Sequence, residues 1–287
     1  MKIGFIGLGL MGFPMAENVL TKLQPDKFFI YNRSTEKSKK FRETHDEVVA
    51  VSSPVEIGDN CDIAILVLTD DQANDDIMSK LLKTVSKDLT IINMSTITPQ
   101  KSIELSEKVK KKGFKYLEAP VSGTIGPAKQ GTLKIYTGGL KTVNDELQSI
   151  LLTMGDQIFY VGDVGKASIV KLLINSILAV YMNILSETLL AADNLGIGKE
   201  KFLDIVNSGI LATIASKGKG PNIIKDNYQV AFPFEHMLKD VTYSSSLLDP
   251  AKMPLINLVK QQYEAGLEKE KGKDFSAIFD YYKQLFK

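Results

Sequence analysis

Apolar residues in the first half of the chain form short continuous runs, and between the runs they recur at the three- and four-residue spacing of an amphipathic helix. The runs predict strands over residues 2–6, 28–31, 47–51, 62–68, 89–93, 114–118, 132–137 and 157–161. The segments between them predict helices over 14–23, 34–44, 71–84 and 98–112, and a short helix from Pro54. Strands that alternate with helices are typical of a doubly wound α/β sheet.

Helical spacing continues from about Gly165 to the end of the chain. Its most apolar part, residues 167–192, contains Lys171, Asn175, Asn183 and Glu187, so we expect a long buried helix rather than a membrane span. The sequence therefore predicts an N-terminal Rossmann-type doubly wound sheet, a long interdomain helix and an all-α C-terminal domain. We place the two domains at residues 1–163 and 164–287.

A glycine-rich turn follows the first predicted strand. Its sequence, Gly7-Leu8-Gly9-Leu10-Met11-Gly12, matches the G-x-G-x-x-G pattern that binds dinucleotides between a strand and a helix. Gly7 allows the tight turn, Gly9 lets the backbone approach a pyrophosphate, and Gly12 lets the helix pack on the strand. We expect a pyrophosphate at this turn, beside Leu10 and Met11 and the free N–H groups of the helix.

The residues after the second predicted strand indicate which dinucleotide binds. NAD enzymes usually carry Asp or Glu there to bind the ribose 2′-hydroxyl, whereas this chain has Asn32-Arg33-Ser34. Among 35 lysines and arginines, only Arg33 and Arg42 are arginines. A guanidinium can hold a 2′-phosphate through two parallel hydrogen bonds, and a lysine cannot. We therefore predict that NADP(H) is the cofactor, bound in part by Asn32, Arg33 and Ser34.

The composition of the chain narrows the classes of partner and of functional site. The formal net charge of +1 offers no electrostatic argument for a nucleic acid or a membrane surface as partner. The single cysteine, Cys61, excludes an internal disulfide, and two histidines argue against a zinc site or a Ser-His-Asp triad. We expect a cytoplasmic protein without a metal, nucleic-acid or membrane partner.

Three further segments carry a family resemblance: Asn93–Pro99 (NMSTITP), Glu118–Thr124 (EAPVSGT) and Lys171–Asn175 (KLLIN). With the glycine turn, in this order and spacing, they resemble the β-hydroxyacid dehydrogenase family over essentially the whole chain. Residues 232–240, FPFEHMLKD, are similar to the F-x-x-x-H-x-x-K-D stretch of its glyoxylate/succinic semialdehyde reductase branch. The resemblance implies an NADP-dependent oxidoreductase of small carboxylates that forms a homodimer or homotetramer, to which an apolar tail helix at 274–286 could contribute.

Two polar segments follow predicted strand ends, where ligands bind in open α/β sheets. The hydroxyls of Ser95 and Thr96 could face the nicotinamide, and the resemblance places Thr96 near cofactor and substrate. The Ser122 hydroxyl and the N–H groups beside Gly123 could form a small anion cradle. The resemblance implies that Ser122 and Gly123 hold the substrate carboxylate, and a plain Ser-Gly turn is the alternative interpretation.

Lys171 is the candidate catalytic residue, and Asn175 shares its helix face one turn later. Burial would lower the pKa of Lys171 toward working pH, so that it can give a proton to a carbonyl oxygen as hydride arrives at carbon. A lysine that reaches solvent from a buried helix is the alternative. The resemblance makes Lys171 the acid/base and lets Asn175 bind substrate.

In the last segment, the resemblance implies that Lys239 reaches the cofactor and Phe232 lines the substrate pocket. Asp240 would brace the site by pairing with a lysine, while we expect His236 to be a packed, hydrogen-bonded residue.

The sequence also departs from the family pattern. Ala167 stands where many members have glycine, four residues before the lysine, and Thr124 stands where several have another glycine. Glu118 replaces a more frequent aspartate. Thr124 argues mildly against 3-hydroxyisobutyrate as substrate.

The leading hypothesis is NADPH-dependent reduction of a small aldehyde or keto acid, such as succinic semialdehyde or glyoxylate. A 3-hydroxyisobutyrate-type dehydrogenase that runs in the oxidative direction is the nearest alternative. A non-catalytic dinucleotide-binding scaffold is a further alternative, against which the presence of both Lys171 and Asn175 argues. An imine reductase is another, although such relatives usually lack the lysine.

Overall fold

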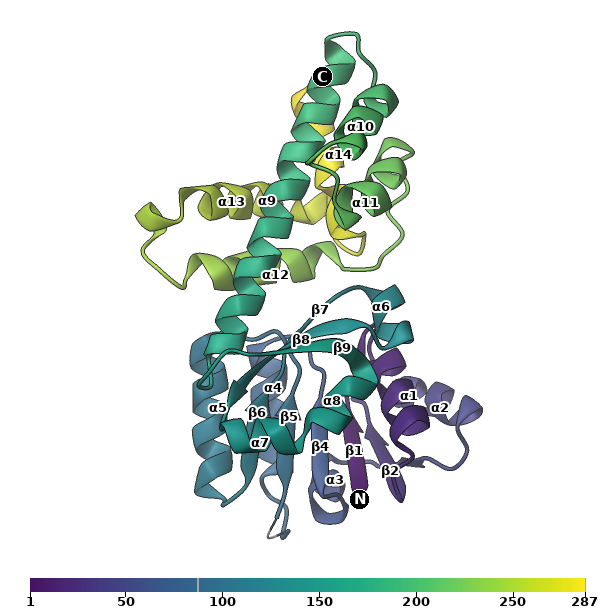
Figure 1. Cartoon of the computed structure of the whole chain (residues 1–287), viewed down its shortest axis with the longest axis vertical. Helices are drawn as coiled ribbons and strands as arrows, with labels where there is room; N and C mark the ends of the chain where they lie inside the picture. The colour runs from purple at the N-terminus through teal and green to yellow at the C-terminus, as the bar shows by residue number, and fades with distance from the viewer. Residues whose placement is uncertain (87, 287) are drawn as a thin grey trace. The chain divides into compact units, whose positions relative to one another are not determined.

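The computed structural model describes residues 1–86 and 88–286. The chain divides into two compact units, a first unit of Met1–Lys171 and a second unit of Leu172–Lys287 (Figure 1). The division falls within a long helix, after Lys171, whereas the expected boundary at residue 163 lies in the loop before that helix. The position of the domain boundary stays a prediction.

The first unit is built on one twisted sheet. Its strands are β1 (Lys2–Ile6), β2 (Lys27–Tyr31), β3 (Val49–Ala50), β4 (Ile63–Leu66), β5 (Thr90–Asn93), β6 (Lys115–Glu118), β7 (Val121–Ser122), β8 (Leu133–Gly139) and β9 (Gly155–Tyr160). The strand order is β3-β2-β1-β4-β5-β6-β8-β7, with β9 paired to β8. Pairing is parallel from β3 to β6, antiparallel where β8 meets β6 and β7, and parallel again between β8 and β9. The chain reverses its direction of winding between β1 and β4, which is where open sheets of this kind bind ligands.

Helices cover both faces of this sheet (Figure 1). They are α1 (Gly12–Leu23), α2 (Thr35–Thr44), α3 (Pro54–Asn60), α4 (Asp71–Leu81), α5 (Pro99–Lys111), α6 (Ile125–Gln130), α7 (Lys141–Glu146) and α8 (Gln148–Met154). In β4, Ile63 and Ile65 belong to the core that includes α1 and α8, whereas Ala64 and Leu66 belong to the core that includes α4 and α5. The two-residue alternation of a strand therefore buries both sides of β4, and the predicted Rossmann-type sheet is confirmed.

Residues 121–154 contain the elements that the sequence pattern did not predict. They are the two-residue strand β7 and the short helices α6, α7 and α8. Each is shorter than the window of about 11–18 residues in which helical periodicity can be recognised, and α6 contains Gly126 and Pro127, which disfavour helix. These helices still contribute Ala128, Val143 and Ile150 to the core against α1.

The second unit is all helical, as predicted. The long helix α9 (Lys166–Asn194) starts in the first unit and continues into the second, which also holds α10 (Lys199–Ser208), α11 (Ile214–Ile224), α12 (Phe234–Ser245), α13 (Pro254–Glu270), α14 (Ile278–Leu285) and the 3-10 turns η1 (Pro250–Lys252) and η2 (Phe275–Ala277). Tyr263, Phe234 and Phe279 are fully buried in its core. The expected tail helix at 274–286 is divided into η2 and α14.

Helix α9 is apolar along most of its length. Length and composition alone would let it cross a membrane, and 50% of its most apolar stretch is buried in the structure. The core helices of soluble proteins have the same two properties, so this finding is weak evidence for a membrane span.

Candidate active site

The glycine turn between β1 and α1 has the geometry of a pyrophosphate site. Gly7 has φ +104°, and a Cβ there would lie 2.2 Å from the Val67 carbonyl oxygen. A Cβ on Gly12 would lie 1.9 Å from the carbonyl oxygen of Gly7, whereas a Cβ on Gly9 would meet no atom within 4 Å. Packing therefore requires glycine at the first and third positions, and the open space at Gly9 lets a pyrophosphate approach the backbone.

Asn32 connects this turn to the end of β2. Its Oδ1 accepts a hydrogen bond from the Leu8 N–H at 2.8 Å, and its Nδ2 donates to the Ser34 carbonyl at 2.9 Å. Arg33 and Ser34 are exposed beside it. Ser34 occupies the N-cap position of α2, but its hydroxyl makes no capping hydrogen bond. Arg33 thus directly follows the residue that connects the glycine turn to the end of β2.

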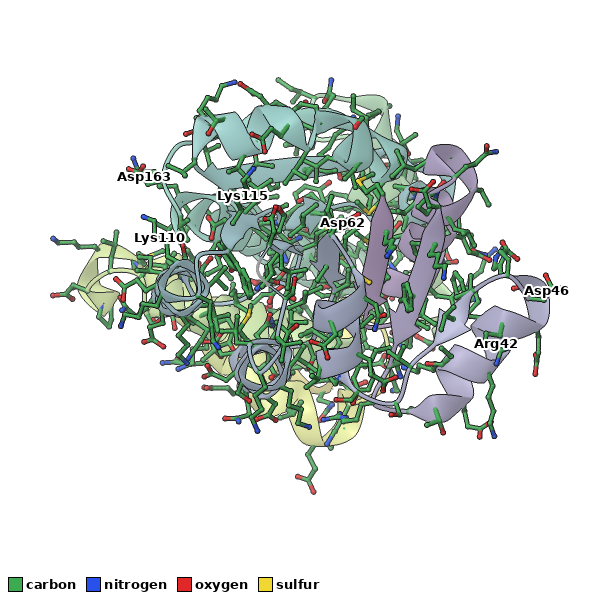
Figure 2. The ribbon with its side chains drawn as sticks, turned by 90° about the horizontal axis from the view of Figure 1, so that it is seen from below. Arg42, Asp46, Asp62, Lys110, Lys115 and Asp163 are labelled. Atoms are coloured by element: carbon green, nitrogen blue, oxygen red, sulfur yellow. The ribbon has the colours of Figure 1, made fainter. Side chains whose placement is uncertain are left out.

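The other arginine has a different setting. Arg42 lies in the last turn of α2 and projects from that helix (Figure 2). The two arginines of the chain therefore offer a matched pair, one beside the glycine turn and one on a helix surface.

The ends of β4 and β5 are joined by a serine. Ser95 is 3% exposed, and its Oγ accepts a hydrogen bond from the Leu68 N–H at 2.9 Å. This hydroxyl holds two strand ends together, and its contact with the nicotinamide stays a prediction. Thr96, the next residue, is half-buried and remains the candidate for contact with the cofactor.

Ser122 and Gly123 follow each other at the end of β7. The Ser122 Oγ is buried and has no hydrogen-bond partner within residues 1–86 and 88–286. Gly123 has φ +138°, and a Cβ there would lie 2.5 Å from Leu133 Cδ2. A buried hydroxyl without a partner costs about 1–3 kcal/mol. Such a group is a suitable donor for a substrate carboxylate that binds beside it.

Lys171 lies on α9 and is 8% exposed, one helical turn before Asn175, which is 4% exposed. Ala167 and Leu172, which flank it along the helix, are fully buried. Burial of an ammonium group costs free energy unless the surroundings stabilise the charge. Buried charged groups are therefore found often at functional sites.

Asp240 joins the polar residues of the second unit. Asn175 Nδ2 donates to Asp240 Oδ2 at 2.6 Å, and Lys239 Nζ pairs with Asp240 Oδ1 at 2.7 Å. Lys239 Nζ also lies 4.8 Å from the centroid of the Tyr243 ring. Asp240 is 2% exposed and therefore fixes both neighbours. The lysine with which it pairs is Lys239.

Phe232 is fixed by a residue that the sequence analysis did not identify. Asp274 is fully buried, and its Oδ2 accepts hydrogen bonds from the N–H groups of Ala231 at 2.9 Å and Phe232 at 3.1 Å. The Phe232 ring lies 5.6 Å from the ring of Phe275 and 6.5 Å from that of His236, measured between centroids. The cap pattern Asp-x-Ser at 274–276 was the available signal, but it predicts only the start of η2.

Comparisons with known proteins show the family to which the chain belongs. Residues 2–162 match the model of the NAD binding domain of 6-phosphogluconate dehydrogenase, and residues 165–282 match the model described as NAD-binding of NADP-dependent 3-hydroxyisobutyrate dehydrogenase. Glyoxylate/succinic semialdehyde reductase 1 of Arabidopsis thaliana is 32% identical over 98% of each chain. The mitochondrial 3-hydroxyisobutyrate dehydrogenase of Mus musculus is 31% identical over 98% of this chain and 87% of its own.

Solved structures show the same fold. The 3-hydroxyisobutyrate dehydrogenase of Mycobacterium tuberculosis, with L-serine, superposes with a TM-score of 0.85 at 21% identity, over 97% of this chain and 98% of the other.

A Rossmann-type sheet with this glycine turn, followed by a helical unit, defines a nicotinamide-dinucleotide-dependent oxidoreductase. The matches over the whole chain place it more narrowly: it belongs to the β-hydroxyacid dehydrogenase family, whose members act on CH–OH groups. The family resemblance inferred from the four sequence motifs is confirmed.

Proposed function

We propose that this protein is an NADPH-dependent reductase of a small aldehyde or keto acid of the succinic semialdehyde or glyoxylate type. The observation that carries the proposal is a lysine, Lys171, that is 8% exposed in the first turns of α9 and precedes Asn175 by one turn. The similarity to a reductase of these two substrates over 98% of the chain supports the substrate class.

Each residue has one task in the proposed reaction. The reduced nicotinamide supplies hydride to the carbonyl carbon when it is bound. Lys171 gives its proton to the carbonyl oxygen, which becomes the hydroxyl of the product. Ser122 and the backbone at Gly123 hold the carboxylate, and Thr96 and Asn175 orient the carbonyl. Asp240 keeps Asn175 and Lys239 in place, so that Lys239 can approach the cofactor, while Asp274 fixes the backbone of Phe232, which lines the pocket.

Preference for NADPH rests on Arg33. No acidic residue stands at Tyr31–Ser34, and Arg33 is exposed beside the Asn32 that fixes the glycine turn. Arg33→Asp should weaken NADPH binding at least about tenfold more than NADH binding, because it removes a guanidinium that pairs with the 2′-phosphate and adds a like charge. Arg42→Asp, on α2, makes the same charge change away from the turn and should leave both affinities within about twofold. Equal losses for both coenzymes in Arg33→Asp would refute the assignment.

The proposed substrate class is tested with a panel of aldehydes and one hydroxy acid. NADPH oxidation is measured with succinic semialdehyde, glyoxylate and an aldehyde without a carboxylate, and NADP⁺ reduction is measured with 3-hydroxyisobutyrate. We expect the highest kcat/KM for the two aldehyde acids and a large loss for the uncharged aldehyde, since the Ser122 cradle would have no anion to bind. A higher kcat/KM for 3-hydroxyisobutyrate would favour the alternative, an oxidative 3-hydroxyacid dehydrogenase.

A further inference from the structure

A buried carboxylate in the first unit has no part in the proposed reaction. Glu118 is the last residue of β6 and is 1% exposed. Its Oε1 accepts hydrogen bonds from the backbone N–H groups of Ala167 at 2.6 Å and Ser168 at 3.2 Å. Its Oε2 accepts from the hydroxyl of Ser168 at 3.2 Å and from that of Ser102. Three of these four donors belong to Ala167 and Ser168 at the start of α9, so Glu118 joins the sheet to the helix that carries Lys171.

The first N–H groups of a helix have no partner within the helix, and a carboxylate at that end also interacts favourably with the helix dipole. In α9 the partner comes from a distant strand, since Glu118 and Ala167 are separated by 49 positions. Ala167 and Ser168 precede Lys171 by four and three residues, so all three lie on one helix face. A shift at the first turn therefore passes directly to Lys171.

The surroundings leave the carboxylate little freedom. Gly138 of β8 lies opposite Glu118 in the antiparallel register, and a Cβ on Gly138 would lie 2.7 Å from Glu118 Oε1. On the other side, the Ser102 hydroxyl lies 3.3 Å from the hydroxyl of Tyr116, to which Asn93 Nδ2 donates at 3.2 Å. The carboxylate is thus enclosed by β5, β6, β8 and α5, and only its full length brings it to α9.

We propose that Glu118 is a positioning residue whose reach sets the start of α9 against the end of β6, and thereby holds Lys171 in place relative to Ser122, which follows Glu118 by four residues. The proposal rests on the role of Lys171 in the proposed function. A displacement of about 1 Å in an active site can lower the rate about a hundredfold.

The length of the Glu118 side chain, rather than its charge, should determine whether it holds the start of α9. The two donors to Oε1 are backbone N–H groups that cannot turn, whereas both donors to Oε2 are hydroxyls that can rotate and accept instead. A glutamine at this position could therefore satisfy all four groups, with its oxygen toward Ala167 and Ser168. An aspartate keeps the charge but is shorter by one carbon–carbon bond of about 1.5 Å, so it would lose contact with α9.

The test compares Glu118→Asp with Glu118→Gln. Glu146→Asp is the matched control, since Glu146 is 56% exposed and pairs with Lys115 at the start of the same strand β6 (Figure 2). Lys171→Ala serves as reference for the proposed function. Three quantities are measured: kcat per NADPH-binding site with succinic semialdehyde, the Kd of NADPH, and the hydrogen exchange of the peptide that contains Ala167 and Ser168, without cofactor.

We expect Glu118→Asp to lower kcat at least about tenfold, to leave the NADPH Kd within about twofold, and to speed exchange at the start of α9. Glu118→Gln should stay within about threefold of the parent in kcat and in exchange, and Glu146→Asp should match the parent. A merely structural role predicts lower thermal stability of Glu118→Asp with an unchanged kcat per site, and that result would overturn the proposal. An equal loss in Glu118→Gln would overturn it too, because charge would then be the determinant. If instead Lys171→Ala keeps full turnover, the proposed function fails, while the exchange data still report whether Glu118 holds α9.

Discussion

Asp274 is the most heavily hydrogen-bonded carboxylate described in the second unit, and its removal should be costly. Its Oδ2 accepts from the N–H groups of Ala231 and Phe232 and pairs with Lys219 Nζ at 2.7 Å. Its Oδ1 accepts from the N–H group of Ser276 at 3.2 Å and from the Ser276 hydroxyl at 2.7 Å. Asp274→Ala leaves five donors without this acceptor in a position that is fully buried.

The expected cost follows from these contacts. Loss of one partner of a buried ion pair costs about 3–5 kcal/mol, because the other charge stays behind. The Lys219 side chain is 16% exposed, so it recovers part of its hydration, and we expect a loss near the lower end, about 3 kcal/mol. Asp274→Asn keeps one acceptor oxygen and should cost about half as much. The double variant Asp274→Ala/Lys219→Met should be less destabilised than the sum of the single variants, because no charge is left unpaired.

Urea unfolding followed by circular dichroism measures these differences, and hydrogen exchange locates them at Ala231 and Phe232. The same loop carries Phe232, so the KM for the aldehyde acid should rise in Asp274→Ala, while the effect on kcat should be smaller. A loss below about 1 kcal/mol, or strictly additive effects in the double variant, would show that the ion pair and its backbone donors do not act together.

Three other predictions concern the remaining features. Gly12→Ala should abolish NADPH binding measured by titration, because its Cβ would lie 1.9 Å from the Gly7 carbonyl oxygen; retained binding would contradict the geometry of the turn. Burial raises the pKa of the Cys61 thiol to about 12, so the native protein at pH 8 should not react with a thiol reagent until urea unfolds it, and fast native labelling would be inconsistent with this burial. Ile210 and Ile214 are 100% and 94% exposed on the single chain, which fits the homo-oligomer expected from the sequence. Substitution of both by aspartate should lower the molar mass measured by light scattering. An unchanged molar mass would exclude these two residues as part of the interface between copies.

The first unit was largely predictable because its strands obey simple physical rules. Strands buried on both faces appear as continuous apolar runs, so the runs at 2–6 and 62–68 located β1 and β4 within a few residues. The glycine turn was predictable as well, since backbone approach and tight packing leave few alternatives to glycine. Short elements such as β7 and α8 could not be predicted, because β7 depends on pairing with β8 and α8 on packing against α1, rather than on their own sequence pattern.

The residues of the candidate site could be predicted only where they belong to a recognisable sequence motif. Asp274 and Glu118 act through contacts with residues far along the chain, which no local pattern encodes. Glu118 and Ala167 were both noted as departures from the family pattern, and only the structure shows that the Ala167 N–H group donates to the Glu118 carboxylate. The two departures therefore concern one contact at the start of α9.

In the proposed reaction, Lys171 gives the proton that completes reduction of the carbonyl group. This role is tested by the rate of NADPH oxidation by Lys171→Met in a single turnover with saturating succinic semialdehyde, with NADPH binding measured alongside. We expect the rate to fall at least about a hundredfold while the NADPH Kd stays within about threefold, since general acid catalysis contributes about 10²–10⁴ in rate. A rate equal to that of the parent, with NADPH bound normally, would contradict it.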